Sequence, residues 1–234
     1  MNIRQHDKYH HRILKHEKFP FAKLKANALV DSIQYSNEEK TLLGIAENMR
    51  EISYILKYLN DSKLYIYSKP STFLRNKIPD ARYLNYHMHN YFNNVYILKG
   101  RMSAFMQRIK RASTEIETKN AASSFYTTIE HFFDRYGKIR DKHTHSVRYI
   151  DNDIYNLETF ESAYSSPLFN SKKIIKKRHI SMAYSEVKNT WLDFMKKSNM
   201  AISNLVSKYL HFVNELILNK DGSFKVTLKK YSYE

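Results

Sequence analysis

Apolar residues recur at steps of three and four along two long stretches of this chain. The first stretch runs through Leu84, Met88, Tyr91, Val95, Leu98, Met102, Phe105 and Ile109. The second runs through Tyr184, Val187, Trp191, Met195, Ser198, Ile202, Leu205, Tyr209, Phe212 and Leu216, and Ser198 is its one polar member. Because this spacing lines one face of an α-helix, the pattern predicts two long amphipathic helices.

The chain has only four Gly and four Pro among its 234 residues. Sandwiches and barrels need many turns and usually contain more of both residues. Hydrophobic residues make up 42% of the chain and aromatic residues 14%, which is too many for a disordered chain. We therefore expect an all-α helical bundle with long helices and minor short strands or loops. The apolar faces of the two long helices, here called seams, could equally pack between two copies of the chain in a dimer.

Two more helices are expected before and after the first seam. Asn37, followed by Glu38 and Glu39, predicts a helix that runs to about Leu59, since acidic residues suit a helix N-terminus. Asp80 can cap the first seam helix. A third helix follows the polar stretch 113–120 and runs directly into residues 140–146. The expected apolar face of that helix is Phe125, Ile129, Phe132, Tyr136 and Ile139.

Other segments lack a helical pattern. Lys63–Tyr67 alternates and predicts a short strand or an extended connection, and residues 150–178 predict a loop or peripheral segment. The last seam helix is expected from about Ser181 to a turn at residues 221–222, with a terminal strand at 223–228. We expect residues 1–79 to form a basic arm plus a helix, packed on the bundle or separate from it. Residues 80–234 are expected to form the helical domain.

Several classes of protein are excluded by what the sequence lacks. It has no cysteine, which excludes disulfides, thiolate nucleophiles and cysteine-based zinc sites. No Walker loop, GxGxxG or HExxH motif is present, so neither a cofactor nor a metal is expected. The N-terminal residues lack the apolar segment of a signal peptide, and no apolar run reaches the length of a membrane span. We therefore expect a cytoplasmic protein without a membrane partner.

The chain is strongly basic, with 39 Lys and Arg against 23 Asp and Glu and a formal net charge of +16. Such an excess attracts polyanions, because each neutralised phosphate releases condensed counterions. RNA, DNA or an anionic membrane surface could be the partner. A merely solvated basic surface is the alternative.

A short motif, KIRDKHTHSVR at Lys138–Arg148, groups residues that could act on RNA. Arg140 and His145 are separated by four residues, and Asp141 directly follows the arginine. Here the chain resembles the HEPN superfamily, whose nucleases carry an arginine, a polar residue and then a histidine at similar spacing. The segment YLNYHMHNYF, Tyr83–Phe92, also looks like the helix that precedes the motif in that family. Asp141 stands where asparagine is frequent in the family.

The resemblance covers about residues 80–218 and implies a helical bundle with metal-independent endoribonuclease activity. It implies a toxin or defence effector that acts as a homodimer, with a composite site made by two motifs. It also implies a possible antitoxin protein as partner. In this chemistry an imidazole moves protons near neutrality, while Arg140 stabilises the negative charge of the phosphorane.

Helix geometry leaves the choice of histidine open. Asp141 and His145 are four residues apart and share a helix face, so Asp141 could orient the His145 ring. Arg140 shares a face with His143, whereas His145 lies about 140° around the helix from Arg140. The Arg140–His145 pair therefore needs a bend or a partner chain. The residues alone keep His143 as a rival, and the resemblance selects His145.

Other residues are weaker candidates. His87 and Asn90 could assist catalysis, although His87 also suits a packed, hydrogen-bonded position. A basic run could contact RNA phosphates, namely Lys172, Lys173, Lys176, Lys177 and Arg178. The histidines of the N-terminal arm, His6, His10, His11 and His16, are expected on a surface and not at a metal. The alternative function is a non-catalytic helical module that binds nucleic acid or a protein.

Overall fold

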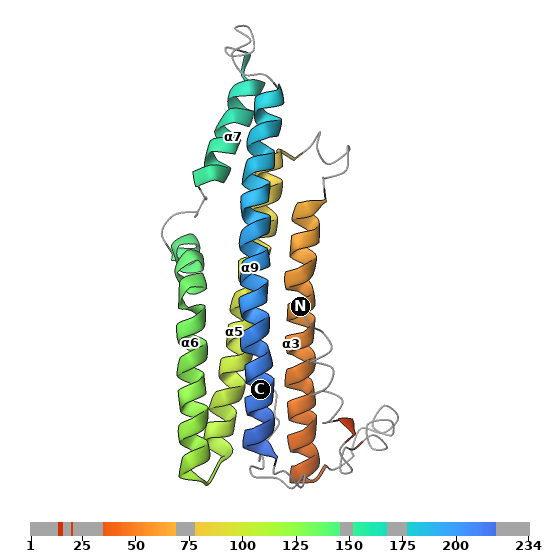
Figure 1. Cartoon of the computed structure of the whole chain (residues 1–234), viewed down its shortest axis with the longest axis vertical. Coiled ribbons are helices and arrows are strands. Elements are labelled where there is room, and N and C mark those ends of the chain that lie inside the picture. Colours follow the sequence, from red (N-terminus) through yellow and green to blue (C-terminus); the bar gives the residue numbers. More distant parts are fainter. Residues whose placement is uncertain are drawn as a thin grey trace. The chain divides into compact units, whose positions relative to one another are not determined.

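The computed structural model describes residues 35–68, 78–145, 152–167 and 177–218, together with Leu14, Lys15 and Pro20. In residues 139–145 it describes the backbone alone. Five helices account for nearly all of this: α3 (Asn37–Tyr67), α5 (Asp80–Ala112), α6 (Ile116–His145), α7 (Asn152–Ser165) and α9 (Lys177–Ile217) (Figure 1). The all-α bundle predicted from the apolar seams is confirmed.

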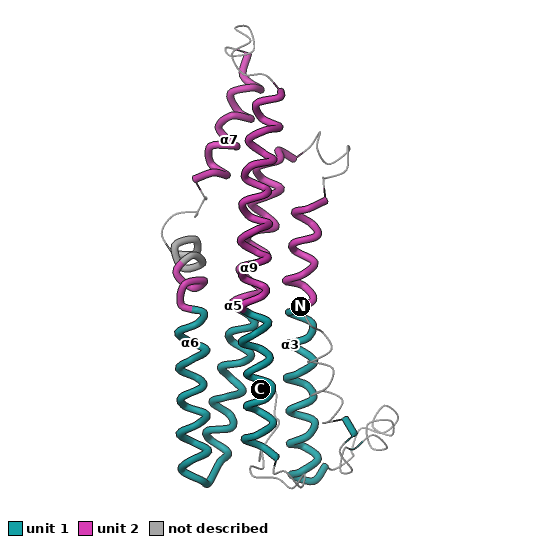
Figure 2. The backbone as a smooth tube through the Cα atoms, viewed as in Figure 1, with its two compact units in different colours: residues 1–56, 97–133, 202–234 teal, residues 57–96, 134–201 magenta. Residues whose placement is uncertain are grey.

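These residues form two compact units, and α3, α5, α6 and α9 contribute to both (Figure 2). Unit 1 contains residues 37–56, 97–112, 116–133 and 202–217 of these four helices. Unit 2 contains their remaining residues and the whole of α7.

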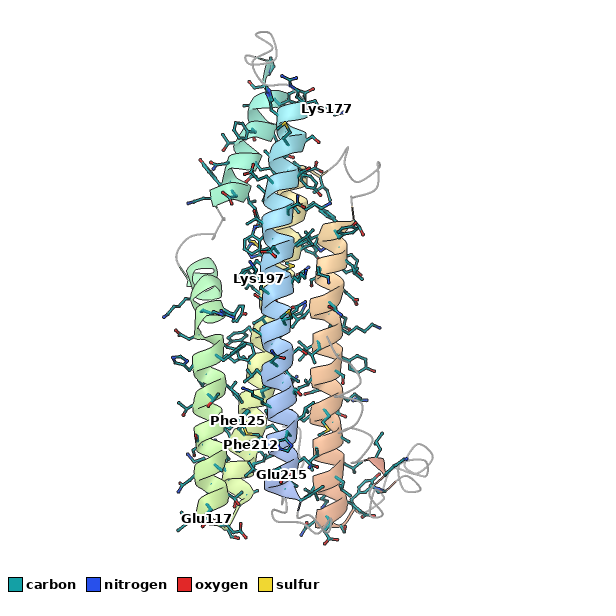
Figure 3. The ribbon with its side chains drawn as sticks, viewed as in Figure 1. Glu117, Phe125, Lys177, Lys197, Phe212 and Glu215 are labelled. Atoms are coloured by element: carbon teal, nitrogen blue, oxygen red, sulfur yellow. The ribbon has the colours of Figure 1, made fainter. Side chains whose placement is uncertain are left out.

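In unit 1 the four helical segments pack as a bundle. The three-residue turn 113–115 joins α5 to α6 and makes them antiparallel. The hydroxyl of Ser103 in α5 donates to Glu130 in α6 at 2.9 Å. Phe125 of α6 stacks on Phe212 of α9 with ring centroids 4.4 Å apart (Figure 3).

A buried amide joins three of these helices. Asn48 of α3 accepts a hydrogen bond from the Tyr209 hydroxyl of α9 at 2.7 Å. Its amide nitrogen donates to the backbone carbonyl of Arg101 in α5 at 3.4 Å. Because both groups of the amide have partners, the polar residue is accommodated inside the core.

In unit 2 aromatic rings join α5 to α9. Tyr91 and Phe92 of α5 contact Phe194 with ring centroids 6.5 and 6.0 Å away, and Phe92 also meets Trp191 edge-on at 6.0 Å. The Tyr91 hydroxyl donates to Asn199 of α9 at 2.9 Å. These contacts bury large aromatic rings, and the Tyr91 hydroxyl keeps a hydrogen-bond partner inside the core.

Both apolar seams lie inside the chain's own core. All eight seam residues of α5 are buried, and so are those of α9 except Phe212, which is half-buried. Ser198, the polar member, is buried as well. The seams are therefore not available as a surface between two copies, and a dimer must use other residues.

Two helix starts differ from the predicted caps. At α3 the cap is Ser36, one residue before Asn37: its hydroxyl accepts from the Glu39 N–H at 3.2 Å, and Glu39 accepts from the Ser36 N–H at 2.7 Å. At α5, Glu161 of α7 accepts from the N–H groups of Asp80 and Ala81 at 2.9 and 3.2 Å. The carboxylate that caps α5 thus comes from a distant part of the chain.

Some predicted segments differ in the structure. Lys63–Tyr67 is neither a strand nor an extended connection but the C-terminal end of α3, because Leu59, Ser62 and Ile66 are buried at helical spacing. Residues 150–178 were expected to be a loop or a peripheral segment, and within them α7 occupies Asn152–Ser165 and buries Ile154 and Leu157. The last seam helix begins at Lys177 and ends at Ile217.

The terminal strand expected at 223–228 lies outside the described residues, and the division at residue 79 stays a prediction. None of the described helices is both long enough and apolar enough to cross a membrane.

Candidate functional site

The Arg140–His145 motif occupies the C-terminal end of α6. This helix begins after a turn in which the Glu115 N–H donates to the Ser113 hydroxyl at 3.2 Å. It then continues without a break to His145. The backbone of Arg140, Asp141, His143 and His145 is therefore helical, and their side chains lie outside the described residues.

Tyr136 is the last described core residue before the motif. It is buried, and its ring lies 6.5 Å from that of Phe194 in α9, within unit 2. Arg135 donates to the Tyr136 hydroxyl at 2.8 Å. The contact between Tyr136 and Phe194 identifies the face of α6 that packs against α9 one turn before the motif.

Counting from Tyr136 assigns each motif residue a helical position. Arg140 and His143 are about 40° and 20° away around the axis, so their positions continue the packed face. Asp141 and His145 are about 140° and 180° away, on the opposite face. On an ideal straight helix Arg140 and His145 would therefore lie on different faces, although the assigned helix α6 runs through both residues.

Next to Tyr136, the hydroxyl of Tyr91 is held as a neutral donor. Burial raises its pKa well above the usual range, and the nearby Tyr136 adds to this effect. Hydrogen bonding to Ser198 and the charge of Arg135 act in the opposite direction but are weaker. Tyr91 therefore serves as a structural donor to Asn199 and does not exchange protons near neutral pH.

His87, a predicted accessory residue, lies in a cluster of tyrosines. Its ring stacks on Tyr65 at 5.2 Å and meets Tyr83 at 4.5 Å and Tyr86 at 5.2 Å edge-on. The Tyr83 hydroxyl donates to the backbone carbonyl of Tyr65 at 3.0 Å. Burial lowers the pKa of His87, so its imidazole is neutral at pH 7. Asn90, the other accessory candidate, lies one turn further along α5 and is partly exposed.

The predicted RNA-binding run is described only at its end. Lys177 and Arg178 begin α9 and are exposed, and Figure 3 labels Lys177. Lys172, Lys173 and Lys176 lie outside the described residues, as do the arm histidines His6, His10, His11 and His16.

The structure also reveals a groove that sequence reasoning missed. It has a volume of about 460 Å³ and lies between the last turns of α3 and the middle of α9, both in unit 2. Its lining residues are Lys63, Leu64, Tyr67, Leu192, Asp193 and Lys196. The helical spacing of the buried Leu59, Ser62 and Ile66 puts Lys63, Leu64 and Tyr67 together on the outside of α3. The sequence holds no signal for the α9 segment that faces them.

Within the described ranges, no group of three or more His, Asp or Glu side chains is placed so that it could hold a metal ion.

Comparison with models of known protein families, with curated proteins and with solved structures gives no match.

Proposed function

We propose that this protein is a metal-independent endoribonuclease of HEPN type that cuts RNA with residues at the C-terminal end of α6. The observation that carries the proposal is the unbroken helix to His145, which sets an arginine, a carboxylate and two imidazoles on consecutive turns. The net charge of +16 supports it, because a basic chain attracts RNA.

In the proposed reaction, His145 accepts the proton of a 2′-hydroxyl, and that oxygen attacks the adjacent phosphorus. Arg140 stabilises the negative charge of the phosphorane with its planar donors, and Asp141 orients the His145 ring. The bond from phosphorus to the 5′-oxygen then breaks, and a protonated imidazole returns a proton to that oxygen. The products carry a 2′,3′-cyclic phosphate and a 5′-hydroxyl.

The proposed site needs two copies of the chain. Arg140 and His145 lie about 140° apart on a straight helix, so one copy cannot direct both at one phosphate. A homodimer that brings two motifs together supplies Arg140 from one copy and His145 from the other, and it also supplies the second imidazole for the acid–base cycle. Roles as a toxin or defence effector in the cytoplasm, with an antitoxin partner, follow from the resemblance to HEPN nucleases.

A non-catalytic module that binds nucleic acid is the second candidate. It is favoured by the groove between α3 and α9, where lysines lie beside an exposed tyrosine.

The test is the chemistry of the cut. Purified protein in EDTA should cleave single-stranded RNA and leave cyclic phosphate and 5′-hydroxyl ends, which end-labelling and mass spectrometry identify. The same oligonucleotide with 2′-O-methyl groups should stay intact, because the nucleophile is blocked. A strict need for divalent metal, or products with 5′-phosphates, contradicts the proposal. If folded protein cuts nothing with or without metal, the binding module stands instead.

A further inference from the structure

The groove between α3 and α9 combines an exposed aromatic ring with two lysines. Tyr67 closes one end and is 68% exposed, and Leu64 beside it is 56% exposed. Lys63 comes from the same helix, and Lys196 comes from the facing helix α9. Exposed apolar side chains beside two lysines suit a ligand that has both an apolar part and a negative charge.

The charges of this groove are unbalanced in favour of the lysines. Asp193, its one carboxylate, pairs with Lys197 at 2.6 Å (Figure 3 labels Lys197). Among the described residues, no carboxylate lies within ion-pair distance of Lys63 or Lys196. An anionic ligand would therefore meet two cations without displacing an existing partner.

Lys188 of α9 contacts Tyr67 at one end of the groove. Its ammonium donates to the backbone carbonyl of Tyr67 at 3.0 Å and lies 5.3 Å from the centroid of the Tyr67 ring. Tyr67 is the last residue of α3, and the last four residues of this helix, 64–67, include no basic residue. Lys188 thus supplies the positive charge that a helix C-terminus favours and holds the ring in place.

We propose that this groove binds one nucleotide of a single-stranded RNA, with the base stacked on Tyr67 and the flanking phosphates on Lys63 and Lys196. The inference rests on the proposed function for the choice of RNA, and it assigns a binding site apart from the cleavage motif. A volume of about 460 Å³ suits a small planar ligand. Aromatic rings beside basic side chains bind single strands because the base and the phosphate need different partners.

Binding is measured by fluorescence anisotropy on the full chain, with a labelled single-stranded 2′-O-methyl RNA that cannot be cut. Tyr67→Ala should weaken binding by at least about fivefold, since base stacking on a tyrosine contributes that much or more. Tyr67→Phe keeps the ring and should bind as wild type does. Tyr155→Ala on α7 removes a tyrosine of similar exposure, 57%, and is the matched control.

The lysines are tested by the salt dependence of the same binding. Lys63→Gln with Lys196→Gln should reduce the slope of log K against log salt by about 1.4, because each single-strand phosphate contact contributes about 0.7. Lys110→Gln with Lys208→Gln changes two exposed lysines of unit 1 and gives the same net charge. This control should leave the slope nearly unchanged.

The outcomes separate the groove from the nuclease. Equal binding by the Tyr67→Ala variant and the wild type overturns the proposal, even if the lysine variant loses affinity, since the groove would then attract charge without stacking a base. Equal slopes for the two lysine pairs also overturn it. If the protein cleaves RNA but the groove variants bind RNA as wild type does, the nuclease proposal stands and the groove proposal is contradicted. If the groove variants lose RNA binding and the wild type cuts no RNA, the groove proposal stands and the nuclease proposal is contradicted.

Discussion

The protonation of His87 follows from its neighbours at the scale of single side chains. Three tyrosine rings cover the imidazole, and burial lowers its pKa below the ordinary 6.5. A neutral imidazole can accept or donate one hydrogen bond but does not serve as a cationic acid near pH 7. Any accessory role of His87 in the proposed RNA cleavage would therefore use the neutral imidazole, as a base or a hydrogen-bonding group, and not a cationic acid.

This gives a pH dependence with a defined sign. The folded state disfavours the protonated imidazole, so the His87 contribution to stability is full above pH 6.5 and is lost as the pH falls below it. Lowering the pH from 7.5 to 5.5 should destabilise the wild type relative to His87→Phe, which keeps an aromatic ring but does not titrate. Urea unfolding of both proteins at both pH values measures the difference. An NMR titration that places the His87 pKa above 6.5 contradicts the assignment.

Residue spacing identified the core but not every face. The α5 seam was predicted in full, because eight apolar residues at helical steps leave one possible interior face. On α6 the buried ring is Phe133 and not Phe132, since two adjacent phenylalanines fit either face in sequence. Lys63–Tyr67 looked like a strand because its apolar residues alternate. Tertiary burial of Ile66 keeps the segment helical.

At the scale of helices, the sequence predicted the presence of the helices more accurately than their ends and the residues that cap them. Glu161 of α7 caps α5 although it lies 81 and 80 residues after Asp80 and Ala81 in the chain, a contact that local sequence does not encode. Burial raises the pKa of this carboxyl; its two backbone hydrogen bonds oppose that rise, and the nearby Asp80 and Glu158 add to it. The motif's helical backbone could be predicted, because the apolar face of α6 continues to Tyr136.

Two helices each contain a glycine with free space beside it. A Cβ added at Gly100 of α5 or Gly137 of α6 would meet no atom within 4 Å apart from the adjacent residues and the nearby backbone of its own helix. Since alanine is favoured over glycine inside a helix by about 1 kcal/mol, Gly100→Ala and Gly137→Ala should each stabilise the protein by up to that amount. Urea unfolding measures the change.

The matched control for these variants is Ala104→Gly at an exposed position of α5, which should destabilise the protein by a similar amount. If either alanine variant is less stable than the wild type, then glycine has a role at that position beyond backbone flexibility.

At the scale of the whole chain, composition and the apolar seams predicted the all-α fold. The scarcity of glycine and proline and the long seams leave few alternatives to helices. The groove between α3 and α9 could not be predicted, because it depends on which exposed faces of two distant segments meet. The composite site across two copies was expected from the resemblance to HEPN nucleases and stays a prediction. Because both seams are buried, a dimer would have to use other residues.

The proposal as a whole depends on one imidazole at the end of α6. The most direct measurement is the rate at which wild type, His145→Ala and His143→Ala cleave a single-stranded RNA in EDTA, with circular dichroism to show that all three are folded. We predict that His145→Ala is slower by about 100-fold or more, since general acid–base catalysis contributes at least that factor, and that His143→Ala cuts nearly as fast as wild type. Loss of cutting in His143→Ala with full activity in His145→Ala, or no cutting by the folded wild type, would contradict this account.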